Sequence, residues 1–574
     1  RCGMTFTSVF RSLALLGLLC AGAALAAGEP AQRPRVGLVL GGGGARGAAH
    51  VGVLETLEKL HVPVDCVAGT SMGALAAGAF AAGRSPTEMR EELAKADWND
   101  MFQDNPSYSE INYRNKAISK RFMPGSETGV GSDGVAYRGG VVAGQKIKLF
   151  FNRLVNADLG ERDIESLALP LSIVATDIGT GERVVYRDGS LTMAMRASMS
   201  VPGLLAPVNY RERKLVDGGL VDNLPISEVR ERCLADVVIA VNVGSPLMKA
   251  EEVGSLFTVS AQMINILTEQ NVNRSLALLQ PNDIYIKPDL EGITAGDFQK
   301  SSETADRGRA AAEAVSARLQ ALAVSAEEYE AWAKRIAYVR PSPPPVDAVV
   351  IDRLKTVNPV AVERHLRVKP GDPIDDARVN QDMLRIYGDG WYESVDYSLI
   401  NVRDRNILHV TPIEKSWGSD YLRFGVNLQT NFKQDSAYTL RAAYDKTWLN
   451  SLGGELLVVG EIGRTNQIGI DLYQPLDARQ RYFMEGSLSY GQETIGFYED
   501  DHKLADFEQT KGIASLGAGA NVGQLGQVHA GWRQRWLEYD LTTGIPSFIF
   551  PERFEERSNG GYLALDFDQM DRLY

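Results

Sequence analysis

Histidine and cysteine are scarce in this chain, with 6 and 4 among 574 residues. Only His50 and His61 precede His365, and both lie before the first candidate nucleophile, Ser71. A hydrolase with a Ser-Asp/Glu-His triad on this kind of turn needs its histidine late in the same domain, after the acid. The sequence therefore excludes that triad from the first 364 residues, and an aspartate is the expected base.

Positive charge is the minority charge. Lys and Arg number 60 against 73 Asp and Glu, which gives a formal net charge of −13 and a pI near 5.2. The chain has no basic field for nucleic acid, and charge alone opposes docking on an anionic membrane, so any contact with lipid must be local and apolar. The sequence also lacks a Walker phosphate loop, and we expect neither a metal nor a cofactor.

The apolar run Leu13–Ala21 near the N-terminus is shorter than the roughly 18 residues that a membrane span needs. Small residues follow it up to Ala27. This pattern predicts a secretory signal peptide over residues 1–27, with a membrane anchor as the weaker alternative.

Cleavage of that segment leaves two cysteines, Cys66 and Cys233. Cys66 lies in an apolar run and Cys233 follows a charged helix, which favours buried free thiols. A disulfide between them is the alternative in an oxidising compartment.

Short apolar runs alternate with helical patterns over residues 28–300, which predicts an α/β hydrolase-like domain. Val36–Leu40 is expected to be a buried strand that enters a glycine-rich loop. A second strand, Val64–Ala68, leads into Gly69-Thr70-Ser71-Met72-Gly73, the G-x-S-x-G pattern of a nucleophile elbow. Ser71 is therefore the candidate nucleophile.

The loop after the first strand reads Gly41-Gly42-Gly43-Gly44-Ala45-Arg46-Gly47. Residues without a Cβ let backbone N–H groups converge on a developing oxyanion, and the helix that follows adds its positive end. The same residues fit the G-x-G-x-x-G pattern of dinucleotide sites. The acid about twenty residues on, Asp65, lies inside the second predicted strand rather than at its carboxyl end, which argues against that alternative.

Two further motifs, Val174–Gly181 and Arg196–Gly203, precede Asp217-Gly218-Gly219. The order and spacing of all these motifs resemble the patatin-like phospholipases over roughly residues 35–246. The resemblance implies that Ser71 attacks an acyl ester and that Asp217 takes its proton. The implied site is catalytic Ser71 and Asp217, an oxyanion region of Gly42, Gly43, Gly44, Arg46 and Gly47, elbow glycines Gly69 and Gly73, and motif glycines Gly218 and Gly219. Asp177 and Asp222 are expected to be structural, in turns or helix caps.

Residues 301–345 contain an alanine- and charge-rich helical stretch, Ser302–Ile336, and a proline-rich boundary. We favour a helix packed on the first domain over an interdomain or dimer helix. Residues 346–415 then predict the order strand, helix, helix, strand, strand. This order resembles a periplasmic POTRA domain, with an unrelated small α+β module as the alternative.

Residues 416–574 show apolar and polar side chains in alternation. Leu422, Phe424, Val426 and Leu428, for example, alternate with Arg423, Gly425, Asn427 and Gln429. About eight such segments, each about ten residues long, predict a transmembrane antiparallel β-barrel of the outer-membrane kind, with a soluble β-sandwich as the alternative. The last residues lack the usual apolar alternation, so the barrel is expected to be truncated.

The three parts together resemble a patatin-like autotransporter of type V secretion with an Omp85-like barrel. The resemblance implies a serine lipid acyl hydrolase of the phospholipase A type in the outer membrane, with its N-terminal domain exposed at the surface or secreted. Implied partners are a phospholipid or another acyl-ester lipid, the barrel assembly machinery and periplasmic chaperones, and a homodimer is left open. The alternatives are a translocation or assembly protein whose patatin domain only binds lipid, and a soluble serine peptidase.

Overall fold

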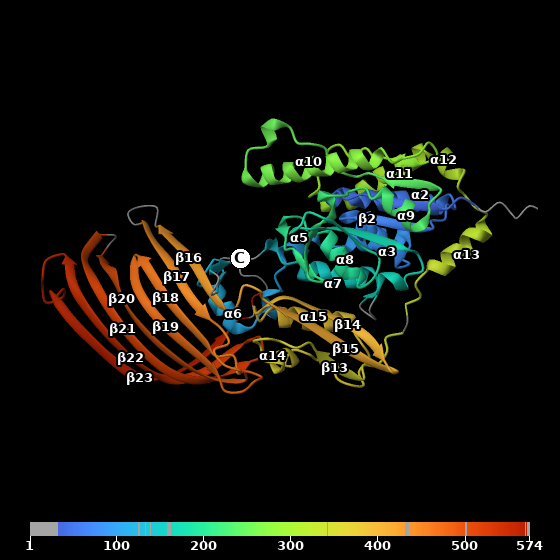
Figure 1. Ribbon diagram of the computed structural model, residues 1–574. Coiled ribbons are helices and arrows are strands. Elements are labelled where there is room, and N and C mark those ends of the chain that lie inside the picture. The colour runs from blue at the N-terminus through green and yellow to red at the C-terminus, as the bar shows by residue number, and fades with distance from the viewer. Residues whose placement is uncertain are drawn as a thin grey trace, which may run out of the picture.

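The computed structural model describes residues 33–123, 127–131, 134–137, 139–157, 162–340, 342–430, 436–499, 502–568 and 570. The predicted signal peptide, residues 1–27, lies outside the described residues. Figure 1 shows an α/β domain, a small α+β module below it and a broad curved sheet to one side. No helix in the described part of the chain is both long enough and apolar enough to cross a membrane.

The α/β domain is built on a mixed sheet with the order β12-β11-β1-β2-β6-β10-β9, and β7 pairs with β6. The strands are β1 (Val36–Leu40), β2 (Cys66–Thr70), β6 (Leu171–Asp177), β7 (Arg183–Tyr186), β9 (Val208–Tyr210), β10 (Arg213–Asp217), β11 (Val237–Val241) and β12 (Ile284–Ile286). The central strands run parallel, and β10 runs antiparallel to β6. Every residue of β1, β2, β6 and β11 is buried, as expected for a parallel sheet covered on both faces.

Helices cover both faces of this sheet. They are η1 (Gly44–Ala48), α2 (Ala49–Lys59), α3 (Met72–Ala81), α4 (Pro86–Lys95), α5 (Trp98–Gln103), α7 (Gln145–Leu154), α8 (Leu191–Ser198), α9 (Ile226–Cys233) and α10 (Leu256–Leu276). Alternate residues of β1 enter two different cores. Leu38 packs in the larger core with α2 and α3, whereas Val39 packs in the smaller core with α9.

The predicted helix Ser302–Ile336 is divided into three: α11 (Ser301–Ala314), α12 (Ser316–Gln320) and α13 (Ala326–Ile336). A capping box between Ser325 and Glu328 starts the last helix anew. α11 packs on α2 so closely that a Cβ on Gly52 would lie 1.8 Å from the Ala305 carbonyl oxygen. The stretch thus packs on the α/β domain and adds Leu319 and Trp332 to its core.

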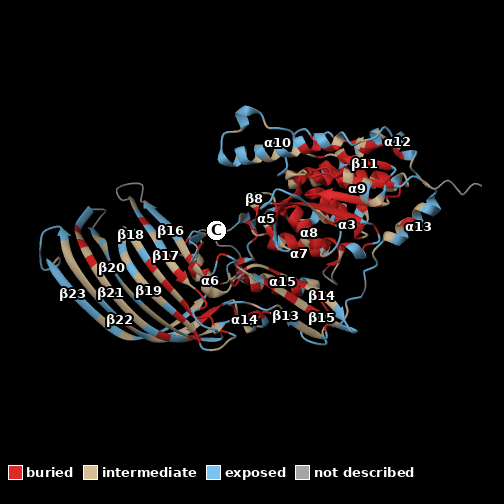
Figure 2. Ribbon diagram, in the orientation of Figure 1, coloured by how far each residue is buried: buried red, intermediate tan, exposed pale blue. Residues whose placement is uncertain are grey.

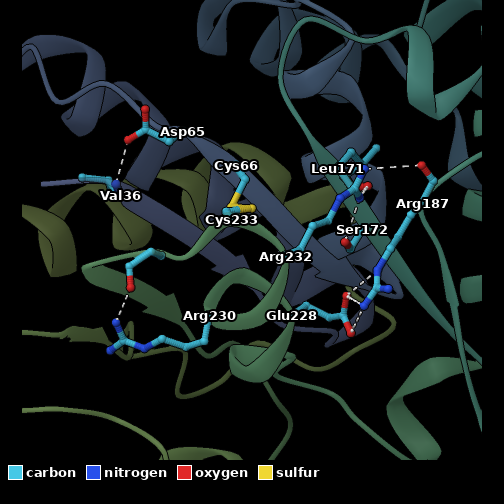
Figure 3. Close-up of a disulfide and its surroundings, with 11 residues drawn as sticks. Val36, Asp65, Cys66, Leu171, Ser172, Arg187, Glu228, Arg230, Arg232 and Cys233 are labelled. Atoms are coloured by element: carbon cyan, nitrogen blue, oxygen red, sulfur yellow. Dashed lines mark hydrogen bonds and ion pairs between the residues drawn. A yellow bond between two sulfur atoms is a disulfide. The ribbon is translucent and has the colours of Figure 1, made fainter.

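Cys66 and Cys233 form a disulfide, which corrects the expectation of free thiols. Figure 3 shows the bond where the end of α9 crosses the start of β2. The two residues are 167 positions apart in the chain, so their meeting depends on the tertiary fold and has no local signal. A structural disulfide is typical of an oxidising compartment.

The small module has the predicted order of elements. These are β13 (Ala348–Ile351), α14 (Pro359–Glu363), α15 (Asp376–Tyr387), β14 (Tyr392–Val402) and β15 (Arg405–Glu414). The sheet order is β13-β15-β14, with β13 parallel and β14 antiparallel to β15. The helices bury Val362, Val379, Met383 and Ile386 in the core of the module.

The curved sheet contains the eight strands expected in the C-terminal part. They are β16 (Asp420–Thr430), β17 (Ser436–Lys446), β18 (Glu455–Gly463), β19 (Thr465–Pro475), β20 (Tyr482–Glu499), β21 (His502–Val522), β22 (Gly526–Thr543) and β23 (Arg553–Phe567). Each is antiparallel to its neighbour, and β20, β21 and β22 reach 18 to 21 residues, longer than expected. Within the described residues the sheet is open, with β23 at one edge.

The two faces of this sheet differ in chemistry because successive side chains point to opposite sides. What we name the polar face carries Arg423, Arg441, Asp445, Glu455, Glu461, Asp471, Glu485 and His529, joined by ion pairs such as Arg441 with Glu461. What we name the apolar face exposes Phe424, Val426, Leu428, Ile468, Ile470, Leu472, Met484, Leu488, Leu516, Trp532, Leu563 and Leu565. Figure 2 shows that these strands are mostly exposed or half-buried, whereas the interior of the α/β domain is buried.

A segment of the α/β domain extends the curved sheet, which the sequence did not predict. It contains α6 (Tyr113–Ser119), β3 (Thr128–Gly131) and β4 (Gly134–Ala136), and β3 pairs antiparallel with β16. Arg114 and Arg121 form ion pairs with Glu455 and Asp471 on the polar face. Ile118 and Phe122 pack against apolar residues of β17 and β18. The α/β domain is thus docked on the strands.

Candidate active site

Ser71 lies between the end of β2 and the start of α3 with the backbone geometry of a nucleophile elbow. Its φ of 54° and ψ of −126° are unusual for a residue with a side chain. Two glycines make the turn sterically feasible. A Cβ on Gly69 would lie 2.4 Å from the Gly73 carbonyl oxygen, and a Cβ on Gly73 would lie 2.0 Å from that of Leu40.

The Ser71 hydroxyl donates a hydrogen bond to Asp217, with Oγ 2.6 Å from Oδ2. Asp217 ends β10, and Ser71 follows β2. Both strands flank β6, so the sheet brings together residues 146 positions apart. The other carboxylate oxygen, Oδ1, accepts the backbone N–H of Gly219 at 2.7 Å. Gly218 allows the close approach of the turn, since a Cβ there would lie 2.3 Å from the Val174 carbonyl oxygen.

Both side chains are nearly closed off from solvent, with Ser71 7% and Asp217 6% exposed. Burial raises the pKa of Asp217 to about 6, and the hydrogen bonds from Ser71 and Gly219 only partly oppose this. A carboxylate of this pKa is largely ionised at neutral pH and yet has a higher proton affinity than an exposed aspartate. It therefore suits a general base.

Neither early histidine supplies an alternative base. His50 is fully buried and its Nε2 lies 2.7 Å from the Gly41 carbonyl oxygen. Burial lowers the pKa of His50 to about 4, so its ring is neutral. His61 stacks on Tyr329 in α13.

The glycine-rich loop lies directly beside Ser71. A Cβ on Gly42 would lie 2.8 Å from the Ser71 Cβ, and one on Gly43 would lie 2.4 Å from the Val243 carbonyl oxygen. Gly44 has a left-handed φ of 58°, and a Cβ there would lie 2.4 Å from the Ala295 carbonyl oxygen. The N–H of Gly42 is used by Asn223, so Gly43 and Gly44 are the loop residues whose N–H groups have no acceptor among the described residues.

Arg46 and Gly47 shape this loop without facing Ser71. The buried guanidinium of Arg46 donates to the carbonyl oxygens of Val243, Leu290 and Ile293, and burial lowers its pKa. A Cβ on Gly47 would lie 2.2 Å from the Met72 Cγ, so this glycine allows η1 to pack on α3. These contacts indicate that Arg46 fixes the loop.

Two residues next to the site were missed at the level of sequence. The Ser198 hydroxyl accepts the Ser71 N–H at 2.8 Å and donates to the Val174 carbonyl oxygen. The Asn223 side chain accepts the Gly42 N–H and donates to the Gly42 carbonyl oxygen. Ser198 falls within the Arg196–Gly203 motif and Asn223 shortly after Asp217-Gly218-Gly219, so position in the motifs was the only available signal.

The other two carboxylates are structural, as predicted. Asp177 Oδ1 accepts the Gly179 N–H in a turn at the end of β6. Asp222 forms an ion pair with Arg183 at 2.7 Å instead of capping a helix. In the described part of the chain, no cluster of three or more His, Cys, Asp or Glu side chains is arranged to hold a metal ion.

Comparison with known proteins identifies the α/β domain. Residues 38–230 match the family model described as patatin-like phospholipase. A patatin-like phospholipase domain-containing protein of Caenorhabditis elegans is 37% identical over 213 residues, 37% of this chain and 14% of that protein. Lysophospholipase NTE1 of Meyerozyma guilliermondii is 30% identical over 292 residues, 47% of this chain and 18% of that protein. The chain thus carries a patatin-like phospholipase domain but spans under a fifth of these two relatives.

Solved structures give weaker likenesses. VipD from Legionella pneumophila has a TM-score of 0.29 at 14% identity, over 50% of this chain and 67% of that one. BamA from Haemophilus ducreyi has a TM-score of 0.29 at 12% identity, over 40% of this chain and 45% of that one. These scores are too low to support an argument.

Proposed function

We propose that this chain is a lipid acyl hydrolase of the phospholipase A type and that Ser71 and Asp217 are its catalytic dyad. The hydrogen bond of 2.6 Å between the Ser71 hydroxyl and the Asp217 carboxylate carries this proposal. The family match over residues 38–230 supports hydrolysis of lipid esters.

The proposed reaction has two steps. Asp217 Oδ2 takes the Ser71 proton while Oγ attacks the ester carbonyl carbon, and the tetrahedral intermediate then releases the alcohol, here a lysophospholipid, which regains that proton. Water then attacks the acyl-serine and gives its proton to Asp217, and the intermediate releases a fatty acid as Ser71 is restored. One ester bond and one water molecule are consumed in each cycle.

The glycine-rich loop is the proposed oxyanion site. The N–H groups of Gly43 and Gly44 are the donors that we assign to the negative oxygen, while Gly42 is held by Asn223 beside Ser71. Loss of one such donor typically costs about 10²–10³ in rate. The loop is thus expected to matter nearly as much as the base.

The test is mass spectrometry of the products that the purified full chain releases from phosphatidylcholine. We expect a fatty acid and a lysophospholipid from the wild type, and a rate at least ~10⁴-fold lower for Ser71→Ala. Ser109→Ala, at an exposed serine of the same domain, is the matched control. Release of the same products by Ser71→Ala contradicts the mechanism, whereas lipid binding without hydrolysis by the wild type supports the non-catalytic alternative. Cleavage of casein instead of phospholipid supports the peptidase alternative.

We also propose that the curved sheet spans an outer membrane and that the small module is a POTRA domain. The exposed apolar face supports the first proposal, because side chains such as Leu488 and Trp532 are suited to lipid. The order and pairing of β13, β14 and β15 support the second. The barrel assembly machinery and periplasmic chaperones are the implied partners.

Export of the hydrolase domain by its own strands stays a prediction. The ion pairs of Arg114 and Arg121 with the polar face hold α6 against the strands, at the end of the sheet that adjoins the small module. A protease added to intact cells is expected to cut an exported domain. A hydrolase domain that is cut only after the outer membrane is opened contradicts export and is explained by this docking.

A further inference from the structure

Among the helices of the patatin-like domain that the structure describes, α10 is the one that exposes large apolar side chains. Only Asn271, Val272 and Ser275, all in its last turns, are buried. Earlier in the helix the exposed fraction is 86% for Leu256, 74% for Phe257 and 60% for Met263. Figure 1 shows this first half extending past the edge of the α/β sheet, with the loop that precedes α10 arching beside it. We name residues 256–267 the apolar half of α10.

The exposed apolar residues form one stripe. Leu256, Val259, Met263, Ile266 and Leu267 recur at intervals of three and four, which places them on one side of a helix. Gln262, outside the stripe, exchanges two hydrogen bonds with the backbone of Met248. The loop that precedes α10 therefore packs beside the stripe and leaves it open.

The charge pattern indicates what the stripe fits. No Asp, Glu, Lys or Arg occurs from Ser255 to Thr268, although the chain as a whole has 23% charged residues and a net charge of −13. A neutral, apolar surface on an acidic protein is complementary to the uncharged acyl region of a bilayer. It provides no ionic partner for an acidic or basic protein.

The size of the stripe argues against a stable dimer. A standard protein interface uses about 20–30 residues from each partner. The stripe, with Phe257 at its margin, has six exposed apolar side chains on one helix. Shallow insertion in a membrane interface needs no more than such a helix.

The other half of α10 contacts the catalytic region. Asn271 donates to the Gly219 carbonyl oxygen at 2.8 Å and accepts the Asn223 N–H at 2.8 Å. Thr268 also donates to the Gly219 carbonyl oxygen. The Gly219 N–H donates to the Asp217 carboxylate, and the Asn223 side chain accepts the Gly42 N–H. Hydrogen bonds therefore connect α10, which carries the apolar stripe, to the base and to the glycine-rich loop.

We propose that the apolar half of α10 inserts into the lipid surface and presents the bilayer to the Ser71 site. This inference rests on the proposed lipid substrate. The strands fix the chain in its own membrane, and α10 gives the hydrolase domain a separate contact with the phospholipid that it cleaves. The positions of Asp217 and Gly42 then depend on α10, whose apolar half lies in the lipid.

The binding test uses the full chain with an environment-sensitive fluorophore on an introduced cysteine, Met263→Cys, in vesicles of phosphatidylcholine with brominated acyl chains. Cys66 and Cys233 are paired and do not react with the label, and Cys2 and Cys20 are replaced by Ser so that position 263 carries the label. We expect quenching of the fluorophore at position 263. Gln270→Cys, at an exposed polar position of the same helix, is the control and is expected to stay unquenched. Equal emission at both positions overturns the proposal, as does a cross-link between two chains through position 263 without quenching.

The activity test compares vesicle phospholipid with a water-soluble short-chain ester. The triple variant Phe257→Ser, Met263→Ser, Leu267→Ser is expected to lose at least about tenfold on vesicles and to stay within about twofold on the soluble ester. The control variant carries Glu269→Ser, Gln270→Ser and Asn273→Ser. Unchanged vesicle hydrolysis by the apolar variant overturns the role of α10. A wild type that cleaves neither substrate refutes the proposed function instead, and the quenching result is independent of it.

Discussion

The patatin-like domain and the curved sheet distribute the same residue types in opposite ways. In the domain, Leu38 and Leu40 are wholly buried, and Ser71 and Asp217 of the site are also buried. In the sheet, Leu488 is 57% exposed while Arg423 and Asp445 pair on the polar face. The contrast supports a two-solvent interpretation, in which water surrounds the domain and, as proposed, lipid surrounds the curved sheet. Within the domain, α10 resembles the curved sheet because it exposes apolar side chains.

The sharpest test of the contrast removes the buried carboxylate that we propose as the base. Asp217→Asn is expected to lower the rate of ester hydrolysis by about 10⁴-fold, because an amide cannot take the Ser71 proton. The measurement is the initial rate on a soluble ester at pH 8. Asp177→Asn, at the other carboxylate near the sheet end, is the control and is expected to retain activity.

Leucines of the two regions should respond differently to truncation. Leu38→Ala leaves a cavity in a packed core and is expected to destabilise the domain by about 2–5 kcal/mol. Leu488→Ala, on the apolar face, is expected to cost about 1 kcal/mol or less in lipid. Thermal unfolding of the full chain in vesicles checks both, and equal losses at the two positions contradict the two-solvent interpretation.

The disulfide joins the start of β2 to the end of α9. Replacing Cys66 and Cys233 by Ser is expected to destabilise the domain by about 2–4 kcal/mol, since the bond closes a loop of 167 residues in separation. Unfolding monitored with and without a reductant checks this. Strands β16 to β23 of the curved sheet contain no cysteine, so the unfolding of this sheet should not respond to the reductant.

A change of pH is expected to alter activity and stability in opposite directions. The pKa of Asp217 is raised to about 6, so activity should fall about tenfold for each pH unit below this value as the base becomes protonated. Stability should move the other way. The folded protein binds a proton that the unfolded chain has lost, so stability falls as pH rises from about 4 to about 6, by up to about 3 kcal/mol. Asp217→Asn should lack this loss, and pH profiles of rate and unfolding check both.

Local patterns were sufficient for much of the fold. β1 begins and ends at the predicted residues, and the elbow around Ser71 has the expected turn, because apolar runs and glycines act within a few residues. The eight strands of the curved sheet were also predictable from the alternation of side chains. The bounds of β20, β21 and β22 were not, because long strands here continue through stretches without clear alternation.

Contacts between distant residues were beyond the reach of the sequence. The absence of a histidine after Ser71 made an aspartate the expected base, and the resemblance to a family then implied Asp217. Ser198 and Asn223, which hold the elbow and the glycine-rich loop, were missed because a serine or asparagine has many uses. The docking of α6 and β3 on the curved sheet was missed because it joins residues some 290 to 350 positions apart.

The bond between Cys66 and Cys233 also makes the stability of the domain depend on the compartment around it. Cys66 begins the strand that ends beside the nucleophile, and Cys233 ends the helix that follows the base loop. The disulfide does not form in a cytosol that keeps thiols reduced, but it forms in an oxidising compartment. The domain therefore reaches its full stability only where its two thiols can be oxidised.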